Sequence, residues 1–357
     1  MTPADSLNHA EEIINRTQLS AIVIGWHQQH GRHNLPWQLQ QDPYHVLVSE
    51  IMLQQTQVAT VIPYFERWLS KLPKVSDLAD ASEDEVMALW QGLGYYSRAR
   101  NLHRAAREVC ASYNGKIPDT PAELRAIPGI GPYTAGAITA FAFDKPAAIV
   151  DGNVARLFCR LFGIAEPLTA AATKNLLWAL ADYYTPESDN RIYAQGLLDL
   201  GATVCKPRTP DCQICPLQPQ CVAYQTNRTT DLPLKKPRAT LPNREADFLL
   251  SITDRGILLE QRPAKGIWPR LYCLPEIIGN PANSAMLHGE FKHTFSHYKL
   301  LARVWSVSDI ETGSDYPTVD SRRIALEELV NYGLPAPIAA YLQTCLPTHL
   351  QNAGNET

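Results

Sequence analysis

The chain has 357 residues, and 32 basic against 36 acidic side chains give it a net charge of −4. A chain of this length forms about two or three domains, each able to bury a core, and 45% hydrophobic with 19% charged residues exclude a disordered or fibrous protein. The charge also excludes a uniformly basic nucleic-acid binder, but not a locally basic groove.

Neither a secretory signal nor a membrane span is expected. The first eighteen residues contain Asp5, Glu11 and Arg16 and no apolar core. Two uncharged stretches, 126–143 and 329–355, are long enough to cross a bilayer, but prolines interrupt both. The sequence therefore predicts a soluble, cytoplasmic protein.

Helical periodicity dominates from about residue 10 to residue 202. Pro43 is placed to begin one helix, and Thr56 to cap the next, with Val58 on its apolar stripe. Thr120-Pro121-Ala122-Glu123 is a capping box with proline at the first helical position. Further helices are predicted over 154–162, 169–184 and 192–200.

Glu50 is the first residue with a chemical signature. It lies three or four positions from Val46, Leu47 and Leu53, so a helix would place it on the apolar face rather than at the surface. Full burial raises a carboxyl pKa by up to about 3–5 units, and a value near ~6–7 suits a general acid at neutral pH. We therefore interpret Glu50 as a functional carboxyl.

Two glycine-rich segments have features of DNA contacts. Gly92-Leu93-Gly94-Tyr95-Tyr96 precedes a run of arginines, which suits a loop in a DNA groove whose aromatic ring helps to extrude a base. Taken alone, that segment fits a solvated basic helix better. In Ile127-Pro128-Gly129-Ile130-Gly131-Pro132, the glycines let a phosphate approach backbone N–H groups at a helix N-terminus. This pattern fits a helix-hairpin-helix, and it also fits a plain corner between two helices.

Asp151 and a cysteine cluster follow the hairpin. Asp151-Gly152-Asn153 opens the next helix, where most aspartates only cap. Four of the eight cysteines then fall within seventeen residues, separated by six, two and five residues: Cys205, Cys212, Cys215 and Cys221. This spacing suits a closed four-cysteine site for zinc or an iron–sulfur cluster, and the spacing alone does not choose between them. A disulfide framework is not expected in this long chain without a secretory signal.

The pattern changes after the cysteines. Residues 228–245 are basic and proline-rich, which predicts an extended linker able to follow a phosphate backbone. Apolar residues then alternate, and strands are predicted over 248–252, 257–259 and 291–307, with short helices over 322–330 and 337–346. The sequence thus predicts an all-α domain, a metal-bearing loop, a linker and a smaller α+β domain.

These features follow the order found in helix-hairpin-helix DNA glycosylases of the endonuclease III superfamily, and the chain resembles the MutY family of adenine DNA glycosylases over nearly its whole length. The resemblance is carried by 49–57, 92–100, 128–134, 151–154 and the four cysteines. It implies a multidomain protein with a helix-hairpin-helix glycosylase domain (1–227), the linker (228–245) and a Nudix or MutT-like domain (246–357). It also implies a [4Fe–4S] cluster, not zinc, at the cysteines.

The resemblance implies a base excision repair enzyme that flips adenine out of a mispair with 8-oxoguanine or guanine in double-stranded DNA and hydrolyses its N-glycosidic bond. Glu50 would protonate N7 of adenine, and Asp151 would stabilise the oxocarbenium-like sugar, as in retaining glycosidases. The other residues that match functional positions of the family are Tyr133 and Asn153 beside the carboxylates, Arg32, Trp37 and Gln195 in the adenine pocket, and Gln55, Thr56, Leu93 and Tyr95 at the gap in the duplex. The enzyme would act as a monomer on nucleoid DNA.

Three further expectations follow from the resemblance. Tyr133 stands where bifunctional relatives carry a lysine nucleophile, so excision without strand cleavage is expected. Phe295-Ser296-His297 matches the segment that reads 8-oxoguanine, whose N7–H the serine hydroxyl can accept. The acidic Nudix box is missing, because residues 280–283 read Asn-Pro-Ala-Asn where a glutamate-rich helix is needed. The C-terminal domain is therefore expected to bind without hydrolysing.

Three rival functions fit the sequence less well. An oxidised-pyrimidine glycosylase with lyase activity needs a lysine in place of Tyr133. A catalytically silent iron–sulfur protein has no need of both Glu50 and Asp151. A Nudix hydrolase with a DNA-targeting domain needs the missing acidic box.

Overall fold

The structure is a computed structural model that describes residues 3–234, 240–279, 281, 285–295, 297–307 and 321–346. The chain forms two compact units. The first combines 1–79 with 104–238, and the second combines 80–103 with 239–357. The segment 80–103 thus groups with the C-terminal part of the chain, and the three-part division expected from the sequence stays a prediction.

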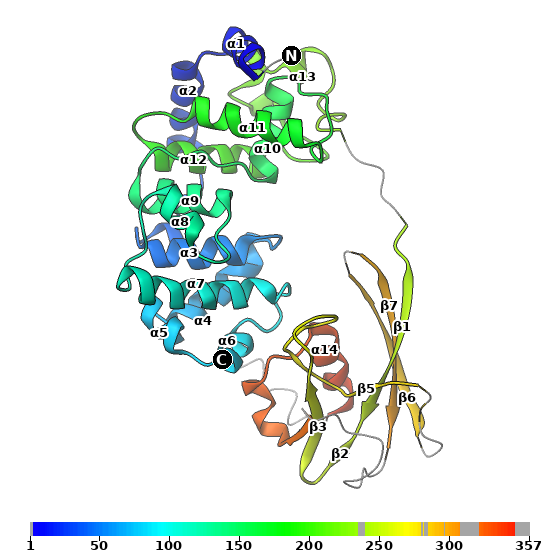
Figure 1. Cartoon of the computed structure of the whole chain (residues 1–357). Helices are drawn as coiled ribbons and strands as arrows, with labels where there is room; N and C mark the ends of the chain where they lie inside the picture. Colours follow the sequence, from blue (N-terminus) through cyan, green and yellow to red (C-terminus); the bar gives the residue numbers. More distant parts are fainter. Residues whose placement is uncertain are drawn as a thin grey trace. The chain divides into compact units, whose positions relative to one another are not determined.

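The first unit is helical, as Figure 1 shows. Helices α5 and α7 cross its limits. Its elements are α1 (Pro3–Ile13), α2 (Arg16–His30), η1 (Pro36–Gln38), α3 (Pro43–Leu53), α4 (Val58–Lys71), α5 (Val75–Asp80), α7 (Ser97–Tyr113), α8 (Pro121–Ala126), α9 (Pro132–Phe143), α10 (Gly152–Leu161), α11 (Ala171–Tyr184), α12 (Asn190–Asp199), the π-helical turn η2 (Leu200–Val204), η3 (Cys212–Ile214), η4 (Gln218–Gln220) and α13 (Val222–Gln225).

Helix α9 is buried along most of its length. Its sequence is apolar on every side, and residues 134–142 are all buried where α9 packs against α3 and α12. Gly136 allows close packing, because a Cβ at this position would lie 2.1 Å from the carbonyl oxygen of Ala148. The helices that carry Glu50 (α3) and Gln195 (α12) therefore both pack on the helix that carries Tyr133 (α9).

Most predicted helix starts are found. Pro43 begins α3, and Thr120 caps α8 by accepting a hydrogen bond from the backbone N–H of Glu123 at 3.3 Å. The predicted cap at Thr56 is wrong, because α4 begins one residue later, after Gln57. Thr56 lies in the turn before that residue.

The second unit contains two sheets, one mixed and one antiparallel (Figure 1). One sheet has the order β5-β1-β7-β6, in which β1 and β7 run parallel. The other has the order β2-β3-β4, and β8 also pairs with β3. The elements of this unit are α6 (Glu83–Leu89), β1 (Asn243–Leu250), β2 (Ile252–Thr253), β3 (Gly256–Gln261), β4 (Tyr272–Cys273), β5 (Glu276–Ile277), β6 (Met286–Thr294), β7 (Lys299–Ser306), β8 (Ser321–Ile324), η5 (Leu326–Asn331) and α14 (Ala336–Cys345).

The predicted strand regions correspond to β1, β3, β6 and β7, whereas β4, β5 and β8 were not predicted as strands. The predicted run over 291–307 is two antiparallel strands, β6 and β7. The helix predicted over 322–330 is wrong at its start, because Ile324 is buried and pairs with Ile257 of β3. Only a short 3-10 turn, η5, follows. In the described ranges, no helix combines the length and apolar character needed to cross a bilayer.

Candidate active site

Glu50 lies on the buried face of α3 and is only 5% exposed, as its place on the apolar stripe predicts. Tyr133, in the first turn of α9, donates a hydrogen bond from its hydroxyl to Oε2 of Glu50 at 2.8 Å. The bond joins two helices that pack on each other. The carboxyl is therefore both shielded from water and held in a fixed orientation.

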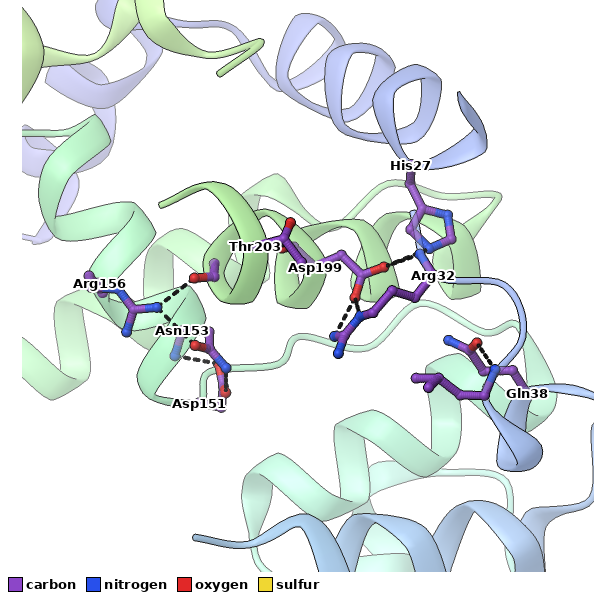
Figure 2. A network of polar contacts seen from close by, with 10 residues as sticks. His27, Arg32, Gln38, Asp151, Asn153, Arg156, Asp199 and Thr203 are labelled. Atoms are coloured by element: carbon purple, nitrogen blue, oxygen red, sulfur yellow. Dashed lines mark hydrogen bonds and ion pairs between the residues drawn. The ribbon is translucent and has the colours of Figure 1, made fainter. Parts of the chain in front are cut away.

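Asp151 caps α10 and receives three hydrogen bonds, of which Figure 2 shows the contact with Asn153. Its Oδ1 accepts from the backbone N–H groups of Asn153 and Val154, each at 2.8 Å. Its Oδ2 accepts from Nδ2 of Asn153 at 2.8 Å. The side-chain amide is one donor more than a simple helix cap supplies, so both carboxylate oxygens have fixed directions.

The two carboxyls differ electrostatically. Burial raises the pKa of Glu50 to about 7; the hydrogen bond from Tyr133 opposes this shift, and the nearby charge of Asp151 adds to it. Burial also raises the pKa of Asp151, but its hydrogen bonds and the charge of Arg156 oppose the shift. Near neutral pH, Glu50 can therefore hold a proton while the donors around Asp151 favour its anion.

A pocket of about 300 Å³ opens at Glu50. Trp37 and Gln195, both predicted to lie in the base pocket, line it. The other lining residues are Gln38, Gln40, Gln41, Val46, Ser49, Phe141 and Arg191. An aromatic ring surrounded by amides is suited to a flat heterocycle with donors and acceptors on its edge.

Arg32 is not among the described residues that line this pocket. Its Nε and its backbone N–H donate to the two carboxylate oxygens of Asp199, each at 2.7 Å (Figure 2). His27 lies 3.5 Å from the same carboxylate. Although burial raises the pKa of Asp199, His27 and Arg32 together lower it below its usual value. Sequence reasoning missed Asp199, whose position four residues after Gln195 was the available signal.

Arg156 was also missed. Figure 2 shows its contact with Asn153, and it also binds the cysteine loop. Its Nη2 donates to Oδ1 of Asn153 at 2.9 Å and to the carbonyl of Gly201 at 2.6 Å. Its Nε donates to the carbonyl of Cys205 at 2.7 Å. The amide that holds Asp151 is therefore itself oriented from the side of the cysteines.

The four predicted cysteine ligands line one pocket of about 380 Å³. Arg160, which is 2% exposed, donates to Sγ of Cys205 at 3.2 Å. Among the residues described, no three cysteine, histidine or carboxylate side chains form a group that could hold a metal ion. The cysteines surround a cavity beside a buried cation, and this donor set fits an anionic group of several atoms.

The turn between α8 and α9 has the features predicted for a DNA-binding hairpin. Gly129 has φ +87° and Gly131 is the N-cap of α9, and both are exposed. Ile130 between them is buried, which anchors the turn. A Cβ at Gly131 would meet nothing within 4 Å, so the N-terminus of α9 has open space in front of it.

The predicted groove-binding loop lies in the second unit. Gly92, Gly94 and Tyr95 have φ values of +97°, +70° and +49°. Arg98 donates from Nη2 to the carbonyls of Leu93 and Gly94, each at 3.0 Å. Tyr95 is 52% exposed, whereas Leu93 is 6% exposed. Of these two predicted DNA contacts, Tyr95 therefore faces solvent and Leu93 packs inward.

Gln55 and Thr56 follow directly on the helix that carries Glu50. Gln55 is exposed and has φ +58°, and Thr56 is half-buried. Both lie in the turn between α3 and α4, so the predicted gap contacts are adjacent in sequence to the predicted acid.

The predicted 8-oxoguanine segment follows β6. Phe295 is half-buried, with its ring 4.6 Å from that of Tyr298 and 5.7 Å from that of Trp268. His297 is exposed. Ser296 lies outside the described residues, as do three of the four residues where the acidic Nudix box is missing.

Two family models match separate parts of the chain. A family model described as "HhH-GPD superfamily base excision DNA repair protein" matches residues 48–182, and a "NUDIX domain" model matches residues 248–344. Relatives named adenine DNA glycosylase include one from Buchnera aphidicola, 36% identical over 80% of this chain and 85% of the relative. The human protein of that name is 33% identical over 83% of this chain and 68% of its own length.

Two solved structures share the helical fold. A thermostable thymine-DNA glycosylase is 29% identical, with a TM-score of 0.53 over 59% of this chain and 97% of that structure. A non-covalent endonuclease III–DNA complex is 23% identical, with a TM-score of 0.50 over 59% of this chain and 97% of its own. Together with the family models, they confirm a helix-hairpin-helix glycosylase fold followed by a Nudix domain.

Proposed function

The chain belongs to the adenine DNA glycosylase family of base excision repair enzymes, and from that premise we propose that it removes adenine paired with 8-oxoguanine or guanine in duplex DNA. The observation that carries the proposal is the pocket at Glu50, where a shielded carboxyl, an aromatic ring and amides lie together. A flipped purine would enter this pocket, and the hydrolysis would take place there.

Glu50 acts as the general acid. Its pKa of about 7 allows it to carry a proton at neutral pH and to deliver that proton to N7 of adenine. The hydroxyl of Tyr133 orients the carboxyl through its 2.8 Å hydrogen bond. Protonation makes the base a better leaving group, and positive charge develops on the sugar as the glycosidic bond breaks.

Asp151 stabilises that developing positive charge. Asn153 and the first backbone amides of α10 hold its carboxylate, so no reorganisation is needed when the oxocarbenium-like sugar forms. A transient covalent bond from Asp151 to the sugar, as in retaining glycosidases, is compatible with this role. Water then attacks the sugar carbon and displaces the carboxylate of Asp151, or it attacks the cation directly.

The enzyme leaves an abasic site and does not cut the strand. Strand cleavage of the lyase type needs an amine that forms a Schiff base with the sugar. Tyr133 has no such amine, and its hydroxyl is already bonded to Glu50. Strand breakage by the pure enzyme without alkali would contradict this assignment.

Cys205, Cys212, Cys215 and Cys221 hold a [4Fe–4S] cluster. The cavity that they line, with Arg160 beside it, is the supporting observation. When bound, the cluster supplies iron–thiolate bonds that tie the ends of this loop together. Metal analysis of the purified protein tests the assignment: about four iron atoms per chain with visible absorbance support it, and one zinc atom would contradict it.

The segment 295–297 reads the base opposite adenine. Phe295 and His297 flank Ser296, whose hydroxyl can accept the N7–H that 8-oxoguanine has and guanine lacks. The protein binds nucleoid DNA as a monomer. Replacing both Phe295 and Ser296 with alanine should remove the preference for 8-oxoguanine, and an unchanged preference would exclude this role.

A single-turnover assay tests the whole proposal. Duplexes carry adenine opposite 8-oxoguanine, guanine or thymine, and products are analysed with and without alkali. We expect excision from the first two duplexes only, with strand breaks appearing only after alkali. Glu50→Gln should bind these duplexes and lose excision by about 10²–10⁴-fold, whereas loss of binding in this variant would point to a structural role for Glu50.

A further inference from the structure

The turn formed by Trp268, Pro269 and Arg270 has no role in the function proposed above. Trp268 and Arg270 have φ values of +48° and +64°, which bulky side chains rarely adopt. The backbone N–H of Leu271 donates to the carbonyl of Trp268 at 3.1 Å and closes the turn. Such strained residues persist only where the surrounding structure fixes them. The contacts of this turn therefore show which segments it connects.

On one side, the turn is bonded to the helix that follows the Tyr95 loop. Arg100, in the first turn of α7, donates from Nη1 to the carbonyl of Pro269 at 2.8 Å. Tyr96 makes a second link, because its hydroxyl donates to the carbonyl of Leu334 at 2.8 Å. Both links join 80–103 to the C-terminal part of the same compact unit.

On the other side, the turn supports the segment predicted to read 8-oxoguanine. Trp268 is 8% exposed, and its ring lies 5.7 Å from Phe295 and 6.3 Å from His293. The backbone N–H of Phe295 donates to the carbonyl of Tyr298 at 2.8 Å. The carbonyl that Arg100 binds belongs to Pro269, the residue directly after Trp268. The contact with Arg100 and the contact with Phe295 are therefore made by consecutive residues.

We propose that Arg100 and Trp268 are positioning residues that fix the exposed Tyr95 ring relative to Phe295. The two rings would then contact the strand opposite adenine with a fixed spacing. This inference rests on the proposed function. Fixed spacing leaves less to be ordered when DNA binds, and the two contacts then reinforce each other. Neither positioning residue needs to touch the base.

Hydrogen exchange in the protein without substrate tests the link directly. Arg100→Met keeps the apolar part of the side chain and removes the donor to Pro269. We expect amide exchange at Phe295 to become about tenfold faster, the effect of losing one such hydrogen bond on local opening. Arg100→Lys, whose ammonium can still donate, should restore slow exchange. Arg104→Met is the matched control, because Arg104 is an exposed arginine on the same helix.

Unchanged exchange at Phe295 in Arg100→Met, or an equal change in Arg104→Met, would overturn the inference. A double-mutant cycle supplies the second readout: affinity for duplexes with adenine opposite 8-oxoguanine is measured for Arg100→Met, Phe295→Ala and the double variant. We expect the double variant to bind within about twofold of the weaker single variant, and multiplication of the two losses would overturn the coupling. If the intact protein did not excise adenine from these duplexes but the exchange result held, the proposed function would fail and the positional link would stand.

Discussion

Replacing Glu50 with glutamine should stabilise the folded protein at alkaline pH even though it removes excision. Glutamine has nearly the same shape, and its side-chain oxygen can still accept the hydrogen bond from Tyr133. It cannot carry a charge, however. The pKa of Glu50 is raised from 4.5 to about 7 in the folded protein, so the folded state binds this proton more tightly than the unfolded chain does.

The size of the effect follows from that shift. A rise from 4.5 to about 7 corresponds to roughly 3 kcal/mol at about 1.36 kcal/mol per pKa unit. Below about pH 4.5 the carboxyl is neutral in both states, and nothing is lost. Between about pH 4.5 and 7 the free energy of unfolding of the wild-type protein falls, and above about pH 7 the whole penalty is present.

Urea denaturation at pH 5 and pH 8.5 measures this difference. The glutamine variant should gain roughly 3 kcal/mol relative to wild type at the higher pH and less than about 1 kcal/mol at the lower one. Excision by the same preparation should fall by at least about a hundredfold. An advantage equal at both pH values, or a variant less stable at pH 8.5, would refute the argument that a buried charge is the cause.

Three further predictions concern the partner of this carboxyl, the packing of α9 and the cysteine loop. Tyr133→Phe removes a donor that lowers the pKa of Glu50, so the alkaline fall of the pH–rate profile should move up by about 1–2 units. Tyr193→Phe is the control: it removes a buried hydroxyl that has no hydrogen-bond partner among the described residues, and it should leave the profile in place. Gly136→Ala should lower the free energy of unfolding by about 2 kcal/mol or more in urea titrations, because the added Cβ meets the carbonyl oxygen of Ala148, and a loss below ~0.5 kcal/mol would contradict this packing. If the cysteines hold the proposed cluster, removing its iron should lower the melting temperature by several degrees, and an unchanged melting curve would show that the cysteine loop is stable without it.

Local sequence pattern predicted the residues whose signal lies within one element. Glu50 could be placed because the apolar spacing of its own helix buries it, and Asp151 because a helix start follows it directly. The cysteines could be grouped because they are close in sequence, and they do line one cavity. The strand periodicity likewise predicted β1 and β3, although the sequence does not show which strands they pair with.

Long-range partners could not be predicted in the same way. Arg32 reads as a pocket residue from a motif, yet Asp199, 167 residues later in the chain, takes its hydrogen bonds. Nothing near Arg156 in sequence reveals that it binds the carbonyl of Cys205. The four-residue segment of β8 was predicted to be helical from its local sequence. It forms a strand because its pairing with β3 outweighs that local preference. Each of these outcomes depends on which segments meet in three dimensions.

The left-handed backbone of Tyr95 bears on any attempt to engineer this protein. Asparagine or glycine would adopt φ +49° with less strain than tyrosine, so selection for heat resistance alone would favour losing the ring. That ring is half-exposed and contributes little to the core, whereas the proposed contact with DNA depends on it. A variant library selected for thermal stability without a mismatch substrate would therefore accumulate stable proteins that have lost this contact with DNA.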